Sequence, residues 1–103
     1  GNDLMNKVQY LLQLLQEECS EVIQDSSKCN RFGCNSRSHA SQTPMSNFQH
    51  LVGELNDVFA IVQMLQNEGF DLTNFGNQDA IDAKIAKVKR YMQDSINEGL
   101  LDA

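Results

Sequence analysis

The feature that most constrains this chain is the spacing of its apolar residues, which recur every three or four positions over long runs. This spacing places them on one face of an α-helix. The first run contains no proline or glycine before Gly33, so we expect a helix over about residues 4–30 with Asp3 as its N-cap. Its apolar face comprises Leu4, Val8, Leu11, Leu12, Leu15, Cys19 and Val22.

Two further helices are expected towards the C-terminus. Ser46 or Asn47 can cap the second helix, and Gly69 is a natural residue to end it. Its apolar face comprises Phe48, Leu51, Val52, Leu55, Val58, Phe59, Val62 and Leu65. Asn77 can cap the third helix, which should end before Gly99 and turn inward Ile81, Ile85, Val88, Met92 and Ile96. No strand-type alternation interrupts this pattern, so we predict an all-α fold with two long antiparallel helices and a third C-terminal helix.

Residues 33–46 lack helical periodicity and are rich in serine, asparagine and glycine, which indicates a loop. Helix connections usually span roughly 2–8 residues, and longer structureless loops are often functional or disordered. This loop carries Arg37 and His39, which could close over a ligand, although a plain insertion explains the segment equally well. The chain of 103 residues is expected to form a single domain over residues 1–103, with this loop as an insertion.

Bulk composition excludes several classes of partner. The formal net charge of −6 argues against binding to a nucleic-acid backbone, which requires clustered lysine and arginine. No apolar run approaches the roughly 20 residues that a membrane-spanning helix needs.

The three cysteines, Cys19, Cys29 and Cys34, contain no CxxC pair, which favours free thiols in a reducing cytoplasm. A zinc site formed by Cys29, Cys34 and His39 would lack its fourth ligand and the usual spacing.

Two pairs of acidic residues lie beside the apolar faces of the first two helices. Glu18 and Glu21 are three residues apart, as are Glu54 and Asp57, so each pair projects from one side of its helix. If the helices pack side by side, the four carboxylates converge and repel one another unless a cation lies between them. Carboxylate oxygens suit Mg²⁺ or Mn²⁺. We therefore interpret the chain as a metal-dependent enzyme of phosphate chemistry.

These residues also support a family resemblance. Glu17-Glu18-x-x-Glu21 followed by Glu54-x-x-Asp57 resembles the acid signature of the MazG-like all-α nucleoside triphosphate pyrophosphohydrolases. The similarity extends through Val22-Ile23-Gln24, Ser27-Lys28 and Arg31-Phe32-Gly33, and to Asn47 before the second acid pair. It covers about residues 10–68. Residues 22–53 separate the two acid pairs, a gap at or past the long end of the family's range, and the excess falls in the 33–46 loop.

The resemblance implies Mg²⁺-dependent cleavage of the α–β phosphoanhydride of a nucleoside triphosphate, giving the monophosphate and pyrophosphate as housecleaning of the nucleotide pool. Glu18, Glu21, Glu54 and Asp57 would hold the metal, with Glu17 as a supporting acid. The candidates to contact the substrate are Lys28, Arg31, Asn47, Lys84, Lys87 and Arg90. The alternative is a non-catalytic helical interaction protein that pairs its apolar faces with itself or with a partner.

A chain this short has too few helices to cover the apolar surface that its sequence supplies. The first helix offers more apolar residues than one seam can bury, namely Leu11, Leu12, Leu14, Leu15, Val22 and Ile23, and the second adds Ile61 and Met64. Large exposed apolar patches are rare in soluble monomers. We therefore expect a homodimer or homotetramer, in which paired hairpins form the core of a four-helix bundle.

Overall fold

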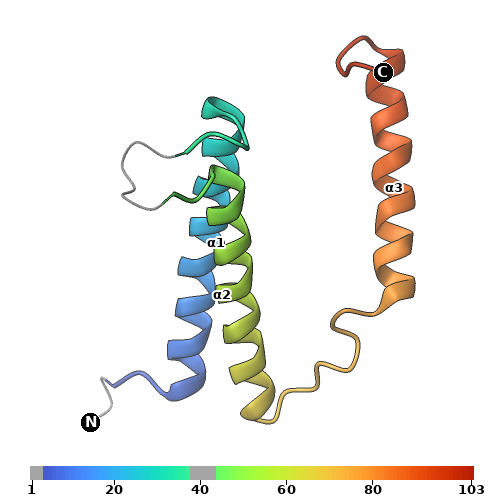
Figure 1. Ribbon diagram of the computed structural model, residues 1–103. Helices are drawn as coiled ribbons and strands as arrows, with labels where there is room; N and C mark the ends of the chain where they lie inside the picture. Colours follow the sequence, from blue (N-terminus) through green and yellow to red (C-terminus); the bar gives the residue numbers. More distant parts are fainter. Residues whose placement is uncertain (1–3, 38–43) are drawn as a thin grey trace. The chain divides into compact units, whose positions relative to one another are not determined.

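The structure, a computed structural model, describes residues 4–37 and 44–103, and its regular elements are helices (Figure 1). In chain order they are α1 (Lys7–Phe32), α2 (Asn47–Asn67) and α3 (Gln78–Asn97). The described parts of the chain contain no β-strand, and only an isolated bridge pairs Arg37 with Ser46. The prediction of an all-α fold is therefore confirmed.

The chain divides into two compact units, the first ending at Phe70 and the second beginning at Asp71. The first unit contains α1 and α2, and the second contains α3. A single domain over residues 1–103 stays a prediction. In the part of the chain that the structure describes, no helix has both the length and the apolar character needed to cross a membrane.

The start of α1 is determined by a reciprocal pair of side-chain hydrogen bonds. The Asn6 side chain accepts a hydrogen bond from the Gln9 backbone at 2.8 Å, and the Gln9 side chain accepts one from the Asn6 backbone at 3.0 Å. This capping box satisfies two backbone donors that the first turn would otherwise leave unpaired. The helix therefore begins at Lys7, and the prediction of Asp3 as its N-cap is wrong. Asp3 itself lies outside the described residues.

The boundaries of α2 and α3 agree with the sequence signals. Ser46 caps α2 through a second capping box with Gln49, and the Asn77 side chain accepts a hydrogen bond from the Ala80 backbone at 2.9 Å. Gly69 follows the last turn of α2 with a φ of 102°, a conformation that glycine adopts without steric cost. The connection between α1 and α2 occupies residues 33–46, as predicted, and His39 lies in the part of it that is not described.

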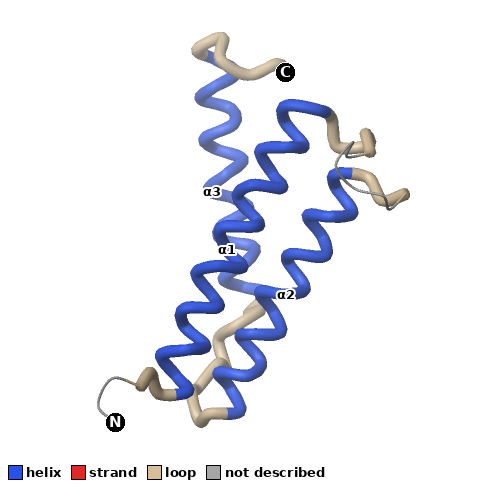
Figure 2. Tube along the Cα trace, turned by 90° about the vertical axis from the view of Figure 1, so that its left-hand side faces the viewer, coloured by secondary structure: helices blue, strands red, loops and turns tan. Residues whose placement is uncertain are grey.

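The first two helices form an antiparallel hairpin, in which α1 and α2 lie side by side (Figures 1 and 2). An ion pair between Lys7 Nζ and Glu68 Oε1, at 3.2 Å, joins the end of the hairpin that lies away from the loop. The apolar core lies towards this same end. It consists of the buried residues Leu11, Ile61 and Leu65, with Leu14 and Leu15 packed against them.

Asn47 closes the opposite end of the hairpin. It is 3% exposed, and its side-chain amide donates a hydrogen bond to the Gly33 carbonyl at 3.0 Å. Its backbone N–H donates to the Ser36 carbonyl at 2.8 Å. Asn47 therefore connects the start of α2 to the chain that follows α1.

The predicted apolar faces are buried only in part. On α2, Leu51, Val58, Val62 and Leu65 are buried or half-buried, whereas the other four residues of the predicted face are exposed: Phe48, Val52, Leu55 and Phe59. On α3 no residue is buried, and the prediction that its apolar face turns inward is not tested by the second unit alone. The reason is that the second unit contains no other helix against which this face could pack.

Replacing Asn47 with alanine should lower the free energy of unfolding by about 1–3 kcal/mol, because the Gly33 carbonyl loses its partner at a buried site. Denaturant unfolding followed by circular dichroism measures the change. Asn56→Ala is the matched control, since Asn56 is an exposed asparagine on the same helix. Equal stabilities of the two variants would contradict a structural role for the Asn47 amide.

Candidate metal centre

The seam between α1 and α2 changes its chemical character along its length. On both helices the less exposed residues recur at alternating steps of three and four, the spacing of a coiled-coil seam. The seam residues of α1 are Val8, Leu11, Leu15, Glu18, Val22, Asp25 and Cys29, and those of α2 are Asn47, Leu51, Glu54, Val58, Ile61 and Leu65. Glu18, Asp25 and Glu54 therefore occupy positions that apolar side chains fill elsewhere along the same seam.

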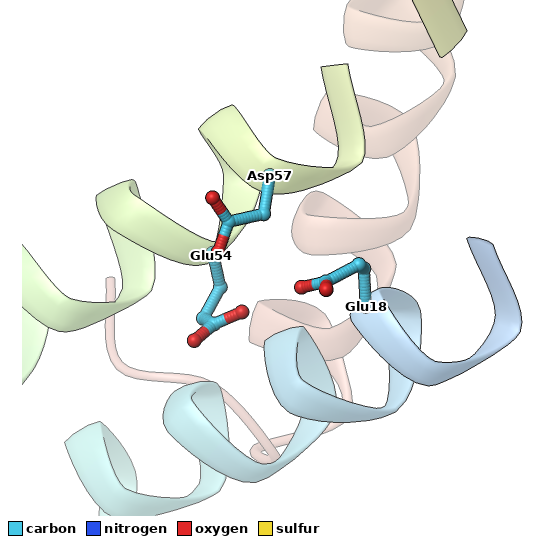
Figure 3. Close-up of side chains that lie close together, drawn as sticks. All are labelled: Glu18, Glu54 and Asp57. Carbon is cyan, nitrogen blue, oxygen red and sulfur yellow. The ribbon is translucent and has the colours of Figure 1, made fainter. Parts of the chain in front are cut away.

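Three carboxylates meet where the seam becomes polar. Glu18 of α1 and Glu54 and Asp57 of α2 each place one carboxylate oxygen so that the three atoms lie within 4.8 Å of one another (Figure 3). Glu18 reaches from its own helix towards Glu54 on the neighbouring helix. Glu18 and Glu54 are half-buried, and Asp57 is exposed. This acid trio thus has a sheltered side between the helices and a side open to solvent.

Glu54 is the most strongly perturbed member of the acid trio. Burial, a hydrogen bond with Glu18 and the negative charges of Asp57, Glu18 and Asp25 together raise its pKa to about 7. Its Oε2 atom is buried and has no hydrogen-bond partner among the described residues. Two carboxyl groups can hydrogen-bond to each other only when one of them carries a proton. Near neutral pH the site therefore holds either a proton or an uncompensated negative charge.

The donor set fits a hard divalent cation. Carboxylate oxygens are the ligands that Mg²⁺ and Mn²⁺ take in proteins, and the buried, unpartnered Oε2 atom of Glu54 offers a lone pair to such an ion. A cation would neutralise the charge that otherwise requires a proton on Glu54. Mg²⁺ usually binds one or two carboxylates and keeps its remaining positions for water and phosphate. The exposed side at Asp57 leaves room for these ligands.

The structure brings together three of the four acids that the sequence pairs predict. Glu21 and Glu17 are exposed and lie outside the acid trio. Three residues beyond Glu18, the helix has turned by about 300°, and the seam continues instead through Val22 and Asp25. The roles of Glu21 as a metal ligand and of Glu17 as a supporting acid stay predictions.

Two further polar residues of the hairpin, one in the seam and one beside it, were not assigned to the site from the sequence. Asp25 is only 9% exposed, its negative charge contributes to the raised pKa of Glu54, and Lys28 Nζ lies 4.0 Å from its Oδ1 atom. The spacing contains the signal, because Asp25 follows Glu18 by seven residues and so returns to the same face. His50 precedes Glu54 by one helical turn, and its Nε2 atom is buried without a hydrogen-bond partner in the described chain.

The residues predicted to contact a triphosphate lie in different parts of the chain. Lys28 and Arg31 lie in the last two turns of α1, where the guanidinium of Arg31 stacks over the Phe32 ring at 4.9 Å from its centre. Asn47 is buried, and its amide is already bonded to Gly33. The other candidates are exposed on α3 in the second unit: Lys84, Lys87 and Arg90. Contact of these six residues with substrate stays a prediction.

The metal-free protein should lose stability as the pH rises from about 4.5 to about 7. The pKa of Glu54 is raised from 4.5 to about 7, so in this range the folded state binds more protons than the unfolded state. Stability falls with rising pH wherever the folded state holds the additional proton. Glu54→Gln removes the titrating group, so it should flatten this profile and raise the melting temperature at pH 8. A gain of about 1 kcal/mol corresponds to about 4–8 °C for a domain of this size.

Thermal unfolding in EDTA at several pH values measures this effect. Glu98→Gln is the control, since Glu98 is exposed on the second unit and should retain the wild-type profile. Identical pH profiles for Glu54→Gln and the wild type would show that Glu54 does not carry the dependence.

Comparisons of the chain with models of known protein families, with curated proteins and with solved structures found no match. The resemblance to MazG-like pyrophosphohydrolases therefore rests on the motif residues alone and stays a prediction.

Proposed function

We propose that the protein is a Mg²⁺-dependent nucleoside triphosphate pyrophosphohydrolase that cleaves the α–β phosphoanhydride to give a nucleoside monophosphate and pyrophosphate. The observation that carries the proposal is the acid trio with the buried, unpartnered oxygen of Glu54 at its centre. The reaction class, cleavage of the α–β phosphoanhydride, comes from the resemblance of the spaced acid motif to the MazG-like pyrophosphohydrolases. We further propose that the protein works in the cytoplasm, where it removes non-standard nucleotides or controls a nucleotide pool.

The cost of placing acids in a helix seam supports a ligand-binding role. Glu18 and Glu54 are half-buried and face each other, and desolvation and mutual repulsion both oppose folding. Apolar residues at the same positions would favour the hairpin, as they do at Leu11 and Ile61. A bound cation would remove the repulsion between the two carboxylates, which would explain why acidic residues occupy these seam positions.

In the proposed mechanism, Glu18 and Glu54 would hold the ion from the two helices, and Asp57 would complete the set on the exposed side. Mg²⁺ in such a site supplies Lewis-acid polarisation of phosphoryl oxygens and lowers the pKa of a bound water. A carboxylate oxygen that does not ligate the ion can accept the proton of the attacking water. Lys28 and Arg31 would orient the triphosphate by charge, and Lys84, Lys87 and Arg90 are proposed to do the same.

Glu54→Gln and Glu18→Gln should each lower turnover by at least about 100-fold, since even residues that merely support metal ligands typically contribute 10–100-fold. The assay follows pyrophosphate release from a panel of standard and modified nucleoside triphosphates with Mg²⁺, and chromatography identifies the nucleotide product. Glu98→Gln is the matched control and should retain full activity. Glu21→Gln separates two metal sets: loss of activity supports the sequence motif, and retention supports the acid trio.

Full activity in EDTA would contradict a metal-dependent reaction. Release of orthophosphate as the first product would contradict α–β cleavage and leave metal catalysis standing. Retained activity in Glu54→Gln would remove the acid trio from the reaction.

We also propose that the protein is a homodimer or homotetramer. Large apolar side chains follow the outer face of α2 with exposures of 41–56%, namely Phe48, Val52, Leu55 and Phe59. They recur at steps of four, three and four, the spacing of a second seam. Pairing of two hairpins into a four-helix bundle would bury this stripe. The same stripe favours the alternative of a non-catalytic interaction protein, but that role gives no reason for the acid trio.

Light scattering should give a mass of two or four times the 11.6 kDa chain. Leu55→Lys, in the middle of the stripe, should shift the protein to the monomer while circular dichroism retains the helical signal. Asn56→Lys places the same charge at the next position and should leave the assembly intact, because Asn56 lies outside the stripe. A wild-type monomer with full activity would show that the stripe does not mediate assembly.

A further inference from the structure

A second group of reactive side chains lies at the loop end of the hairpin, outside the acid trio. Cys29 belongs to the last turn of α1 and is 8% exposed, whereas Cys34 lies in the following loop and is exposed. Both are free thiols. Neither the proposed metal centre nor the proposed reaction uses them.

The backbone holds these two cysteines together. The Gly33 N–H donates to the Cys29 carbonyl at 2.9 Å, and the Cys34 carbonyl accepts from the Phe48 N–H at 3.0 Å. Gly33 turns the chain between them with a φ of 98°, and a Cβ atom at this position would lie 3.0 Å from Ser36 Oγ. The turn therefore brings Cys34 back beside the last turn of α1, and after burial the neighbouring Cys34 is the next cause of the raised pKa of Cys29.

We propose that Cys29 and Cys34 form a reversible intramolecular disulfide when the protein meets a small-molecule disulfide such as oxidised glutathione. The proposal rests on the turn at Gly33, which brings Cys34 back beside the last turn of α1, and on the different exposure of the two thiols, and it does not depend on the proposed function. It assigns Cys34 as the attacking thiol and Cys29 as the resolving thiol.

The reaction proceeds by two thiol–disulfide exchanges. The Cys34 thiolate attacks one sulfur of oxidised glutathione, which forms a mixed disulfide on Cys34 and releases one glutathione thiolate. Cys29 then loses its proton to solvent and attacks the Cys34 sulfur, which releases the second glutathione. The two cysteines lose two electrons and two protons in total, and one oxidised glutathione becomes two reduced molecules. Burial, Cys34 and the charge of Asp25 raise the pKa of Cys29, which is why the exposed thiol reacts first.

The disulfide would join the last turn of α1 to the loop that leads into α2. Asp25 lies one turn before Cys29, and its charge acts on both the Cys29 thiol and the Glu54 carboxyl. The disulfide would therefore form one helical turn from Asp25, which is a polar residue of the seam. Cys19 is exposed in the middle of α1, ten residues from Cys29, and provides an internal control.

The test is incubation of the full chain with oxidised glutathione, followed by alkylation under denaturing conditions and trypsin digestion. Trypsin cleaves after Lys28, Arg31 and Arg37, so the disulfide joins peptides 29–31 and 32–37. We expect this linked pair of peptides, and in Cys19→Ser protein, which has no thiol besides Cys29 and Cys34, the intact mass should decrease by two hydrogen atoms with no cysteine alkylated. Dithiothreitol should restore all three thiols of the wild-type protein.

Single variants distinguish the Cys29–Cys34 disulfide from a glutathione adduct and from a crosslink between chains. Cys19→Ser should form the same linked peptides, and Cys29→Ser should stop at a glutathione adduct on Cys34. A wild-type protein that stops at this adduct, or that crosslinks between chains through Cys19, would overturn the proposal.

Because the two cysteines are close in sequence, the equilibrium must also be compared between native protein and protein unfolded in urea. The native contact should favour the disulfide over the glutathione couple by at least about tenfold relative to the unfolded chain, which corresponds to about 30 mV. Equal equilibria in the two states would show that the folded structure does not favour this disulfide.

Discussion

Carboxyl groups from two helices meet at seam positions that apolar side chains occupy in the other half of the same hairpin. Glu18 and Glu54 face each other across the seam, and Asp57 lies beside them at its exposed edge. Burial and the proximity of the other acids raise the pKa of Glu54 to about 7, so its carboxyl holds a proton to near neutral pH. The hairpin must therefore accommodate a repulsion that a proton or a cation can relieve, and the remaining features of the first unit can be understood from that requirement.

The two ends of the hairpin contribute to its stability in different ways. Away from the loop, Leu11, Ile61 and Leu65 form a small apolar core, and the Lys7–Glu68 ion pair lies beyond it. The loop end relies on polar contacts: the buried amide of Asn47 bonds to Gly33, and backbone bonds connect the loop to the first turn of α2. The acid trio lies between these two regions. Both helices are thus held at each side of the repulsive segment, which allows the carboxylates to remain opposite one another.

The exposed apolar surface complements this arrangement. Within the first unit a stripe of α2 is exposed, and within the second unit no residue of α3 is buried. A hairpin of two helices can shelter one side of each helix only, so residues that face neither partner remain exposed.

The sequence by itself determined the local structure. Its apolar spacing and its capping residues Ser46 and Asn77 predicted the helices, and the acid pairs predicted a cluster of carboxylates between the first two. Only the tertiary structure decided which acids take part, because two helices meet along a seam of alternating steps of three and four. That seam includes Glu18 and Asp25 and leaves Glu21 outside. The burial of α3 could not be inferred either: an amphipathic pattern shows that a helix has an apolar face, but burial requires a neighbouring element, which residues 71–103 do not provide.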